Sequence, residues 1–378
     1  MTRNFLIIAV MLGAFCWTEK APAAEVDYSF LTSIGYTGLD RESGINTNFR
    51  GDDPFNPIRV MVFVESWVNP RLGVFLEFLW DQGKTPNGRS TKPRINGAYA
   101  MARPWDTDAL MFKIGMIPAL FGSWAPRTYV DVNPLVGLPL TYHYRTPIKS
   151  KSLPLDVADL RSWKDSRGLP IVYDACWDHG IIAFGFAGRW DYSIGITKAS
   201  LSSPSAYGNG GAQVLGRLGL KPVVGLALGL SFEYGSYLKK DAENLPPAEK
   251  DHGPNQKALG LDFSYSYAYT SVHAELVRNW WESPNLGTDL GVTSGYVEIQ
   301  QKLSPGLYLA ARFDRLSYDT LQDPIGGSFS WGNAISRVEV GGGYYFSKGV
   351  LLKAVLQHNE IEDKESVDLL SAQLVLTF

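Results

Sequence analysis

The sequence holds few residues whose type and spacing could carry catalysis. It contains no G-x-S-x-G, H-E-x-x-H, phosphate-loop or C-x-x-C pattern. Its histidines are scattered along the chain, and His273 shares one strand face with a carboxylate, Glu275, two residues away. Such a pair could ligate a metal ion or exchange protons, although a solvated pair is the simpler interpretation. We therefore predict no catalytic residue, no metal site and no cofactor, and the chain is not expected to be an enzyme.

Charged side chains instead recur at alternate positions of segments whose other positions are apolar. Because side chains alternate between the two faces of a strand, this spacing puts the charges together on one face. The residues of this kind are Arg59, Glu65, Glu77, Lys113, Arg217, Glu233, Arg312, Arg337 and Glu339. Basic and acidic residues are nearly balanced. They could line a wall against water without net selectivity, and they could equally pair across strands and stiffen that wall.

A second group of charges lies in the segment 118–173. Between positions 122 and 173 the chain has seven basic and four acidic residues, although its formal net charge is −3. Fixed positive charge attracts small anions where the intervening water is confined. The residues that could do this are Arg127, Arg145, Lys149 and Lys151. The sequence leaves open the alternative that they face bulk water or a lipopolysaccharide surface.

The elements that must position these residues are β-strands. In residues 226–234, leucine, phenylalanine and tyrosine alternate with alanine, glycine, serine and glutamate. Small residues on the polar face fit the crowded interior of a barrel. Mean hydropathy is only −0.09, a low value for a protein that spans a membrane. A transmembrane strand, however, needs apolar residues only at alternate positions. About 16 such segments begin near Tyr28, Ile58, Arg71, Arg94, Ala109, Ala175, Trp190, Gln213, Leu226, Ala258, Ser271, Val292, Leu307, Ala334, Val350 and Leu369.

The connections between these segments alternate in length. Short ones, such as 69–70, 188–189 and 304–306, are interleaved with long ones, of which 118–173 is the longest. Short periplasmic turns and long outer loops are typical of outer-membrane barrels. The sequence therefore predicts an all-β fold, a transmembrane antiparallel up-and-down β-barrel of about 16 strands.

The first residues have the features of an export signal. Arg3 supplies positive charge, residues 5–15 are apolar, and Ala21-Pro22-Ala23 fits a cleavage site. We expect residues 1–23 to be a signal peptide and residues 24–378 to form a single outer-membrane barrel domain. Lipidation of Cys16 is the alternative, but the residue before it is the bulky Phe15. The remaining chain stays near neutral, which gives no reason to expect nucleic acid as a partner.

The C-terminal residues carry the most specific pattern. In 370–378 apolar and mostly polar residues alternate, and the last residue is the aromatic Phe378. Here the chain resembles bacterial outer-membrane barrels, whose last strand ends in an aromatic residue that the assembly machinery reads. The strand count and the long third loop resemble 16-stranded porins. Residues 113–118, followed by Phe121-Gly122, are similar to a strand end of phosphate-selective and other substrate-specific porins.

The resemblance implies passive diffusion of small hydrophilic solutes through a water-filled channel. If the basic residues of segment 118–173 lie in the pore, we expect the channel to prefer anions. The resemblance also implies that the third loop folds into the barrel and narrows the pore. That would bring Arg127, Arg145, Lys149 and Lys151 to the constriction. The implied partners are outer-membrane lipid and lipopolysaccharide, the barrel assembly machinery, further copies in a homotrimer, and small solutes.

Two other functions stay open. A structural barrel could act as a sheath for a partner complex, and an outer-membrane phospholipase could share the fold, although no serine and histidine occur at a recognisable spacing. The aromatic residues could stack sugars, but their positions near strand ends favour the interfacial girdles of a barrel. These residues are Trp80, Trp105, Trp190, Trp280, Trp281, Tyr344 and Phe346.

Deleting Phe378 should reduce insertion of the protein into the outer membrane of cells, because the terminal aromatic residue is expected to serve assembly. Refolding of the purified chain into detergent should be largely unchanged. The two outcomes are compared by the amount of heat-modifiable barrel in the membrane fraction and by the refolding yield in vitro. Normal insertion in cells would contradict the assembly role.

Overall fold

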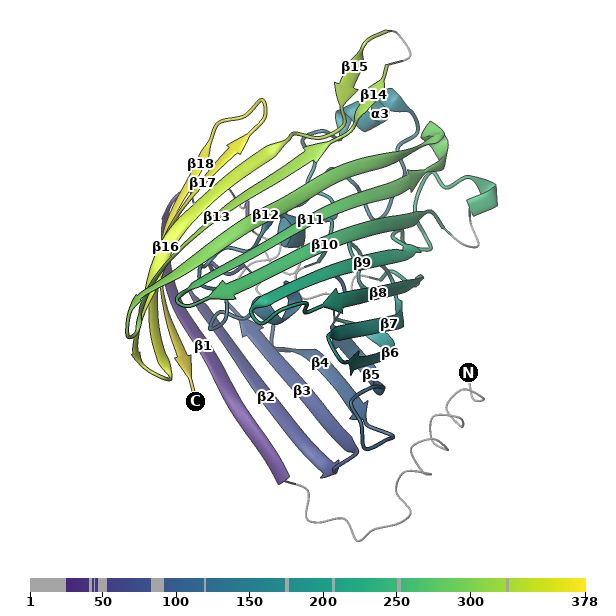
Figure 1. The fold of residues 1–378 in the computed structure, drawn as a ribbon. Helices are drawn as coiled ribbons and strands as arrows, with labels where there is room; N and C mark the ends of the chain where they lie inside the picture. Colours follow the sequence, from purple (N-terminus) through teal and green to yellow (C-terminus); the bar gives the residue numbers. More distant parts are fainter. Residues whose placement is uncertain are drawn as a thin grey trace.

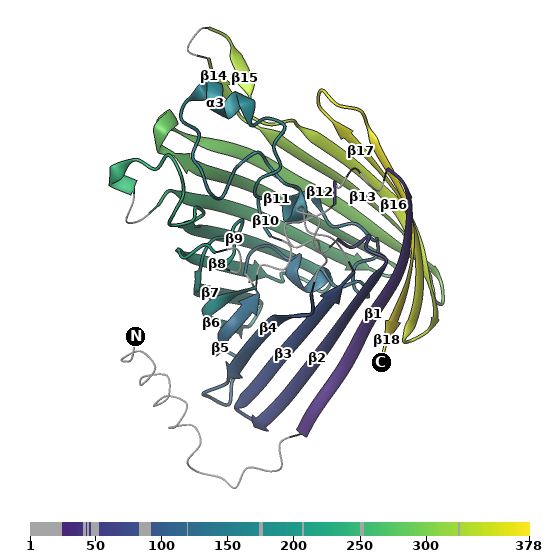
Figure 2. The same ribbon diagram turned by 180° about the vertical axis from the view of Figure 1, so that it is seen from behind.

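Sixteen strands close into one antiparallel barrel in a computed structural model of the chain. The structure describes residues 25–40, 43, 45–46, 53–82, 92–118, 120–173, 177–205, 208–249, 253–323 and 326–378. The predicted signal peptide, residues 1–23, lies outside the described residues. Figures 1 and 2 show the barrel from two opposite sides, with the last strand beside the first. The predicted barrel and its strand number are confirmed.

The barrel strands follow one another along the chain and pair with their neighbours in sequence. The ring closes where β1 pairs with β18, in a register that joins Leu31 to Thr377 and Leu39 to Leu369. The strands are β1 (Glu25–Leu39), β2 (Ile58–Asn69), β3 (Leu72–Asp81), β4 (Arg94–Ala102), β5 (Met111–Pro118), β6 (Trp177–Ala187), β7 (Trp190–Lys198), β8 (Ala212–Leu220), β9 (Leu226–Ser236), β10 (Asn255–Tyr267), β11 (Thr270–Ser283), β12 (Thr288–Ser304), β13 (Leu307–Tyr318), β16 (Ile335–Ser347), β17 (Val350–Ile361) and β18 (Val367–Thr377).

A few short elements lie outside the barrel wall. A hairpin of β14 (Thr320–Gln322) and β15 (Ser328–Ser330) extends the connection that follows β13. The segment between β5 and β6 contains η2 (Ala125–Arg127), α2 (Leu140–His143) and α3 (Val157–Ser162), and η4 (Pro247–Glu249) and η5 (Pro284–Leu286) lie in later connections. None of the helices among the described residues has the length and apolar character needed to cross a membrane.

The two faces of the barrel wall differ as the alternation predicts. In β9, Leu228, Leu230 and Phe232 are exposed, whereas Ser231 and Glu233, at alternate positions, are buried. The same holds around most of the wall, where the buried polar residues include Ser231, Glu233, Asp262, Glu275, Glu298, Arg312, Asp314, Arg337, Glu339, Lys353 and Gln373. The exposed face therefore offers an apolar band, and the opposite face is polar.

The long segment 120–173 packs against the polar faces of many strands. Its residues Leu140, Tyr142 and Leu160 join a hydrophobic core with Val277 of β11 and Leu316 of β13. A second core brings residues Val130, Leu135 and Val136 of the segment together with residues from β1, β2, β3, β13, β17 and β18, namely Leu31, Met61, Leu79, Tyr308, Ala310, Leu351, Val355 and Val375. In Figures 1 and 2 helix α3 of this segment lies at one end of the barrel, beside the β14–β15 hairpin.

One residue assigned to the aromatic girdles is placed differently. Trp80, Trp105 and Trp190 are exposed, as expected for the outer surface, but Trp281 is fully buried and packs edge-on against Trp331 at a centroid distance of 6.0 Å. Its Nε1 lies 3.3 Å from Ser202 Oγ. The prediction for Trp281 was wrong because consecutive residues of a strand face opposite sides, so Trp280 and Trp281 cannot both point outward.

The two faces can be tested on neighbouring residues of β12. Ile299 is exposed in the apolar band, whereas Gln300 lines a wide cavity of about 1090 Å³ beside the turns at 269 and 304–306. Ile299→Arg should lower the free energy of unfolding in lipid by about 2–4 kcal/mol, because a charge there would meet hydrocarbon. Gln300→Arg, the matched control, should cost much less. Equal losses, measured by denaturant titration in liposomes, would argue against a membrane-facing outer surface.

Candidate functional site

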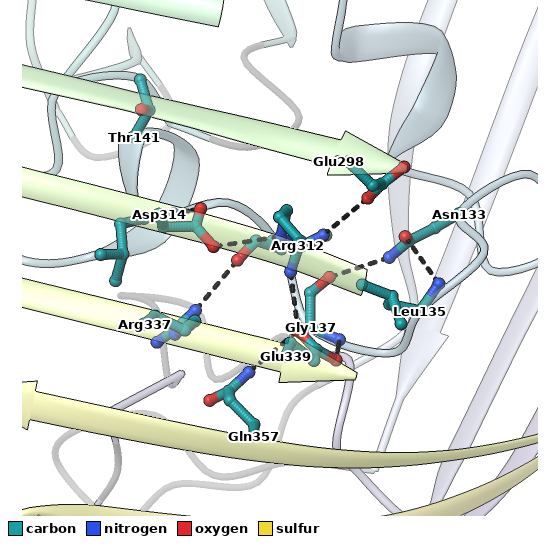
Figure 3. A network of polar contacts seen from close by, with 12 residues as sticks. Asn133, Leu135, Gly137, Thr141, Glu298, Arg312, Asp314, Arg337, Glu339 and Gln357 are labelled. Carbon is teal, nitrogen blue, oxygen red and sulfur yellow. Dashed lines mark hydrogen bonds and ion pairs between the residues drawn. The ribbon is translucent and has the colours of Figure 1, made fainter. Parts of the chain in front are cut away.

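The centre of the polar face is a cluster of buried charges around Arg312 on β13. The guanidinium group binds Glu298 of β12 at 3.1 Å, Asp314 of the same strand at 3.2 Å and Glu339 of β16 at 2.7 Å (Figure 3). All four side chains are at most 1% exposed. Strand pairing creates this cluster, because Arg312 lies directly between Glu298 and Glu339 in the register of the three strands. Arg312 thus faces three carboxylates, whose oxygens can accept further hydrogen bonds from other donors.

The backbone of segment 120–173 supplies further donors to these carboxylates. Glu339 Oε1 accepts hydrogen bonds from the amides of Val136 at 3.2 Å and Gly137 at 2.7 Å. Asp314 accepts from the amide of Leu140 at 3.0 Å, at the start of α2. Gly137 is required here, since a Cβ atom would lie 2.3 Å from Glu339 Oε2. The cluster therefore orders the segment as well as the wall.

Lys353 of β17 also holds segment 120–173 in place, but through a positive charge where Glu339 and Asp314 use negative charges. Its ammonium group is buried and donates to the carbonyl oxygens of Val130 at 2.7 Å, Asn133 at 3.1 Å and Leu135 at 2.9 Å. Three carbonyls satisfy the three N–H donors of the lysine, so the buried charge needs no carboxylate. Residues 130–135 are folded around this one side chain.

Glu275 of β11 anchors the start of the segment. It accepts hydrogen bonds from the amide and hydroxyl of Ser123, at 2.5 and 2.7 Å, and from the Tyr142 hydroxyl. His273, its expected partner, instead lies 2.9 Å from Ser264 Oγ. Within the described ranges no group of three or more His, Cys, Asp or Glu side chains could hold a metal ion. Glu275 is therefore engaged by the segment and not by His273.

Most of the other inward charges predicted from the sequence also have partners. Arg59 pairs with Asp81 at 2.8 Å, and Glu65 accepts from Trp67 Nε1 at 2.5 Å. Glu77 accepts from Asn96 and, at 2.8 Å, from the hydroxyl of Tyr129. Buried Glu233 is different, because neither of its carboxylate oxygens has a hydrogen-bond partner among the described residues.

Arg217 of β8 is held between two aspartates. It binds Asp191 of β7 at 2.6 Å and Asp262 of β10 at 2.7 Å. The guanidinium reaches Asp262 across β9 because Gly229 leaves room there. A Cβ at this glycine would lie 2.1 Å from Asp262 and 2.4 Å from Arg217. The pairing largely offsets the positive charge of Arg217.

Arg337 of β16 joins the wall to α2. It donates to Asn359 at 2.6 Å and to the carbonyl of Leu138 at 3.0 Å, and its Nη1 lies 2.8 Å from His143 Nε2. Burial, together with the neighbouring Arg337 and Arg312, holds the pKa of the His143 imidazole well below 6.5. The neutral ring can accept a hydrogen bond from Arg337, whereas a protonated ring would repel it.

The four basic residues assigned to a constriction have separate surroundings. Arg127 pairs with Glu298 and stacks on Trp124 at 4.9 Å. Arg145 donates to the carbonyl of Gly168 at 3.0 Å, the Lys149 ammonium lies 3.9 Å from the centre of the Trp163 ring, and Lys151 is exposed. Three of the four therefore contact residues of their own segment or solvent.

A cavity of about 500 Å³ lies between segment 120–173 and the wall strands β4–β8. Its charged lining residues, within the described part of the chain, are Lys113, Asp191 and Arg217. None of the four basic residues of the segment lines it. The aromatic residues of its lining are Tyr99, Phe121, Tyr129, Tyr142, Tyr173, Trp177, Phe184, Phe186 and Tyr192.

Sequence reasoning missed the aromatic character of this side of the barrel. Trp67, Phe75 and Tyr99 share the inward face with Glu65 and Glu77. The two-residue spacing of Glu65 and Trp67 on β2, and of Phe75 and Glu77 on β3, could have indicated this. The contribution of Trp177 had no such signal. Its ring lies over β4, where a Cβ at Gly97 would come within 2.5 Å of it. That contact depends on the packing of β6 against β4 across β5.

The buried His143 predicts a pH dependence. Since its folded-state pKa lies below 6.5, the unfolded chain binds a proton below that pH that the folded chain does not. The free energy of unfolding should therefore fall as the pH drops from neutral towards about 5, by up to about 2 kcal/mol from this residue.

His143→Gln, which keeps an acceptor for Arg337, should remove that part of the pH dependence. His179→Gln changes an exposed histidine and serves as the matched control. The measurement is denaturant unfolding of the detergent-solubilised barrel at both pH values. The same pH dependence in the wild type and in His143→Gln would refute the assignment.

Known protein structures share the barrel architecture of this chain, although no sequence relative was found. No protein-family model matches the chain, and no curated protein matches it in sequence. Among solved structures, OmpF of Salmonella typhi has a TM-score of 0.63 at 12% identity, covering 93% of this chain and 97% of that one. An anion-selective porin from Comamonas acidovorans has a TM-score of 0.59 at 9% identity over 94% and 100% of the two chains. OmpT, an outer membrane protein of Vibrio cholerae solved in a trimer form, has a TM-score of 0.58 at 10% identity over 94% and 100%. The fold is thus a porin-type barrel of sixteen strands.

Proposed function

We propose that this chain is a bacterial outer-membrane porin through which small hydrophilic solutes diffuse passively. The observation that carries the proposal is the cavity between segment 120–173 and β4–β8, inside a closed barrel whose outer face is apolar. An apolar outer band suits a bilayer, and a polar interior that retains open volume suits aqueous solutes. The protein acts as a channel and not as an enzyme.

Segment 120–173 narrows the channel by occupying part of the lumen. Its anchors support this, because they lie on the polar faces of strands well separated around the barrel, from Glu77 on β3 through Glu275 on β11 to Lys353 on β17. A segment that is bound to three well-separated strands of a closed barrel has to cross the interior of the barrel. The solute path then runs on the side of β4–β8, where the cavity remains.

The channel prefers anions. Lys113 and Arg217 line the cavity, whereas Asp191, its one acidic lining residue among those described, is bound to Arg217. Confined water screens a fixed charge less than bulk solvent does, so Lys113 can favour anions locally. This assigns the selectivity to the barrel wall and not to Arg127, Arg145, Lys149 and Lys151.

The partners are those of an outer-membrane porin. A homotrimer is supported by the fold shared with OmpT, a protein solved in a trimer form. Lipopolysaccharide contact is supported by Arg278 and Arg315, which lie on the same outward face as the apolar residues Leu276 of β11 and Phe313 of β13. Recognition by the assembly machinery is supported by Phe378, whose side chain is exposed while its backbone pairs with Phe30.

Recordings in planar lipid bilayers test the channel. The full-length barrel should give stepwise conductance, and reversal potentials in a KCl gradient should show chloride permeating more readily than potassium. A correctly folded barrel without conductance would overturn the porin function and favour a structural sheath for a partner complex. Cation selectivity would overturn the anion preference alone.

Lys353→Met should increase the conductance, because the carbonyls of residues 130–135 lose their donor and docking of the segment weakens by about 1–3 kcal/mol. Lys302→Met removes the same charge from the lining of the wider cavity, and Lys302 has no hydrogen bond to segment 120–173 among the described residues. This control should leave the conductance nearly unchanged. Equal effects of both substitutions would mean that the segment does not narrow the path.

A further inference from the structure

A row of aromatic side chains crosses the polar face of the barrel from β2 to β6. The rings of Trp67 and Phe75 are 6.0 Å apart, those of Phe75 and Tyr99 stack at 4.9 Å with an interplanar angle of 13°, and those of Tyr99 and Trp177 stack at 6.3 Å. Tyr99 and Trp177, at the end of the row, line the 500 Å³ cavity. A wall that contacts only water needs polar side chains, such as those on β11–β17. Large aromatic side chains beside an aqueous cavity are therefore unusual.

Lys113 of β5 lies at the end of this row. Its ammonium nitrogen is 5.1 Å from the centre of the Tyr99 ring and 5.0 Å from that of the Phe184 ring, and the residue is half-buried in the cavity lining. No carboxylate pairs with it within the part of the chain that the structure describes, unlike Arg59, Arg217 and Arg312. Two aromatic faces stabilise the cation, but they do not provide acceptors for its N–H donors.

The lining thus offers one free cation and several flat apolar surfaces within a volume suited to a small molecule. The one carboxylate of the lining among the described residues, Asp191, is engaged by Arg217 and does not compete. A ligand that matches this lining has a single negative charge to accept hydrogen bonds from Lys113. It also has an aromatic ring, which packs against the parts of Tyr99 and Trp177 that line the cavity.

We propose that the cavity binds aryl carboxylates, with the Lys113 ammonium holding the carboxylate and the aromatic row holding the ring. The proposal rests on the porin function and adds to it a solute class and a binding site. A phosphate or a simple alkyl carboxylate would use only the lysine, and a neutral aromatic compound or a sugar would use only the rings. An aryl carboxylate uses both.

Binding is measured by isothermal titration calorimetry of the full-length barrel in detergent with benzoate, acetate and benzyl alcohol. Benzoate should bind more tightly than the other two, because each of them lacks one half of the interaction. Lys113→Gln should weaken benzoate binding by about tenfold or more, the effect of losing one charged hydrogen bond. Lys149→Gln is the matched control, since Lys149 also lies over an aromatic ring but outside the cavity.

The same compounds are tested as blockers of ion current. Benzoate should reduce the single-channel current at lower concentrations than acetate or benzyl alcohol, and Lys113→Gln should abolish this difference. Equal binding of acetate would remove the role of the rings, and equal binding of benzyl alcohol would remove that of the lysine. Either result, or unchanged benzoate affinity in Lys113→Gln, overturns the proposal. Benzoate binding without any conductance would overturn the porin function and leave the binding site standing.

Discussion

Closure of the hydrogen-bonded ring is the constraint on which the rest of the structure depends. A strand at the edge of a sheet leaves amides and carbonyls unpaired, and hydrocarbon offers them no partner. The pairing of β1 with β18 removes that edge. Once the ring is closed, the period of two along each strand separates an apolar outside from a polar inside. A charged residue on the inner face can then find a partner only inside the barrel.

The inner charges find these partners in two ways. Some pair across neighbouring strands, as Arg59 does with Asp81 and Arg217 with Asp262. Others are buried under segment 120–173, and there the backbone of the segment completes their hydrogen bonds. Burying a charge is unfavourable unless it is paired and hydrogen-bonded. Glu339 and Lys353 are therefore as dependent on the segment as the segment is on them.

This dependence makes the interior asymmetric. The charged anchors are concentrated on β11–β17, where the segment is bound most densely, whereas β4–β8 face the open cavity with aromatic side chains. Gly97 allows the Trp177 ring to lie against β4, and Lys113 has no carboxylate partner among the residues that the structure describes. One side of the wall thus holds the segment, and the other lines the cavity.

The alternation of residue types along each segment was enough to predict the strands, their number and the inward face of Arg312 or Glu339, because the period of two is a local property of the backbone. The sequence also indicated that residues 118–173 form one long connection. It could not tell that Arg127 meets Glu298 while Lys149 lies over Trp163, since those contacts join residues that only the folded segment brings together. The error at Trp281 shows that strand register predicts the direction of a side chain better than residue type near a strand end does. The free ammonium of Lys113 was likewise decided by tertiary structure, because a charge is unpaired only with respect to what packs opposite it.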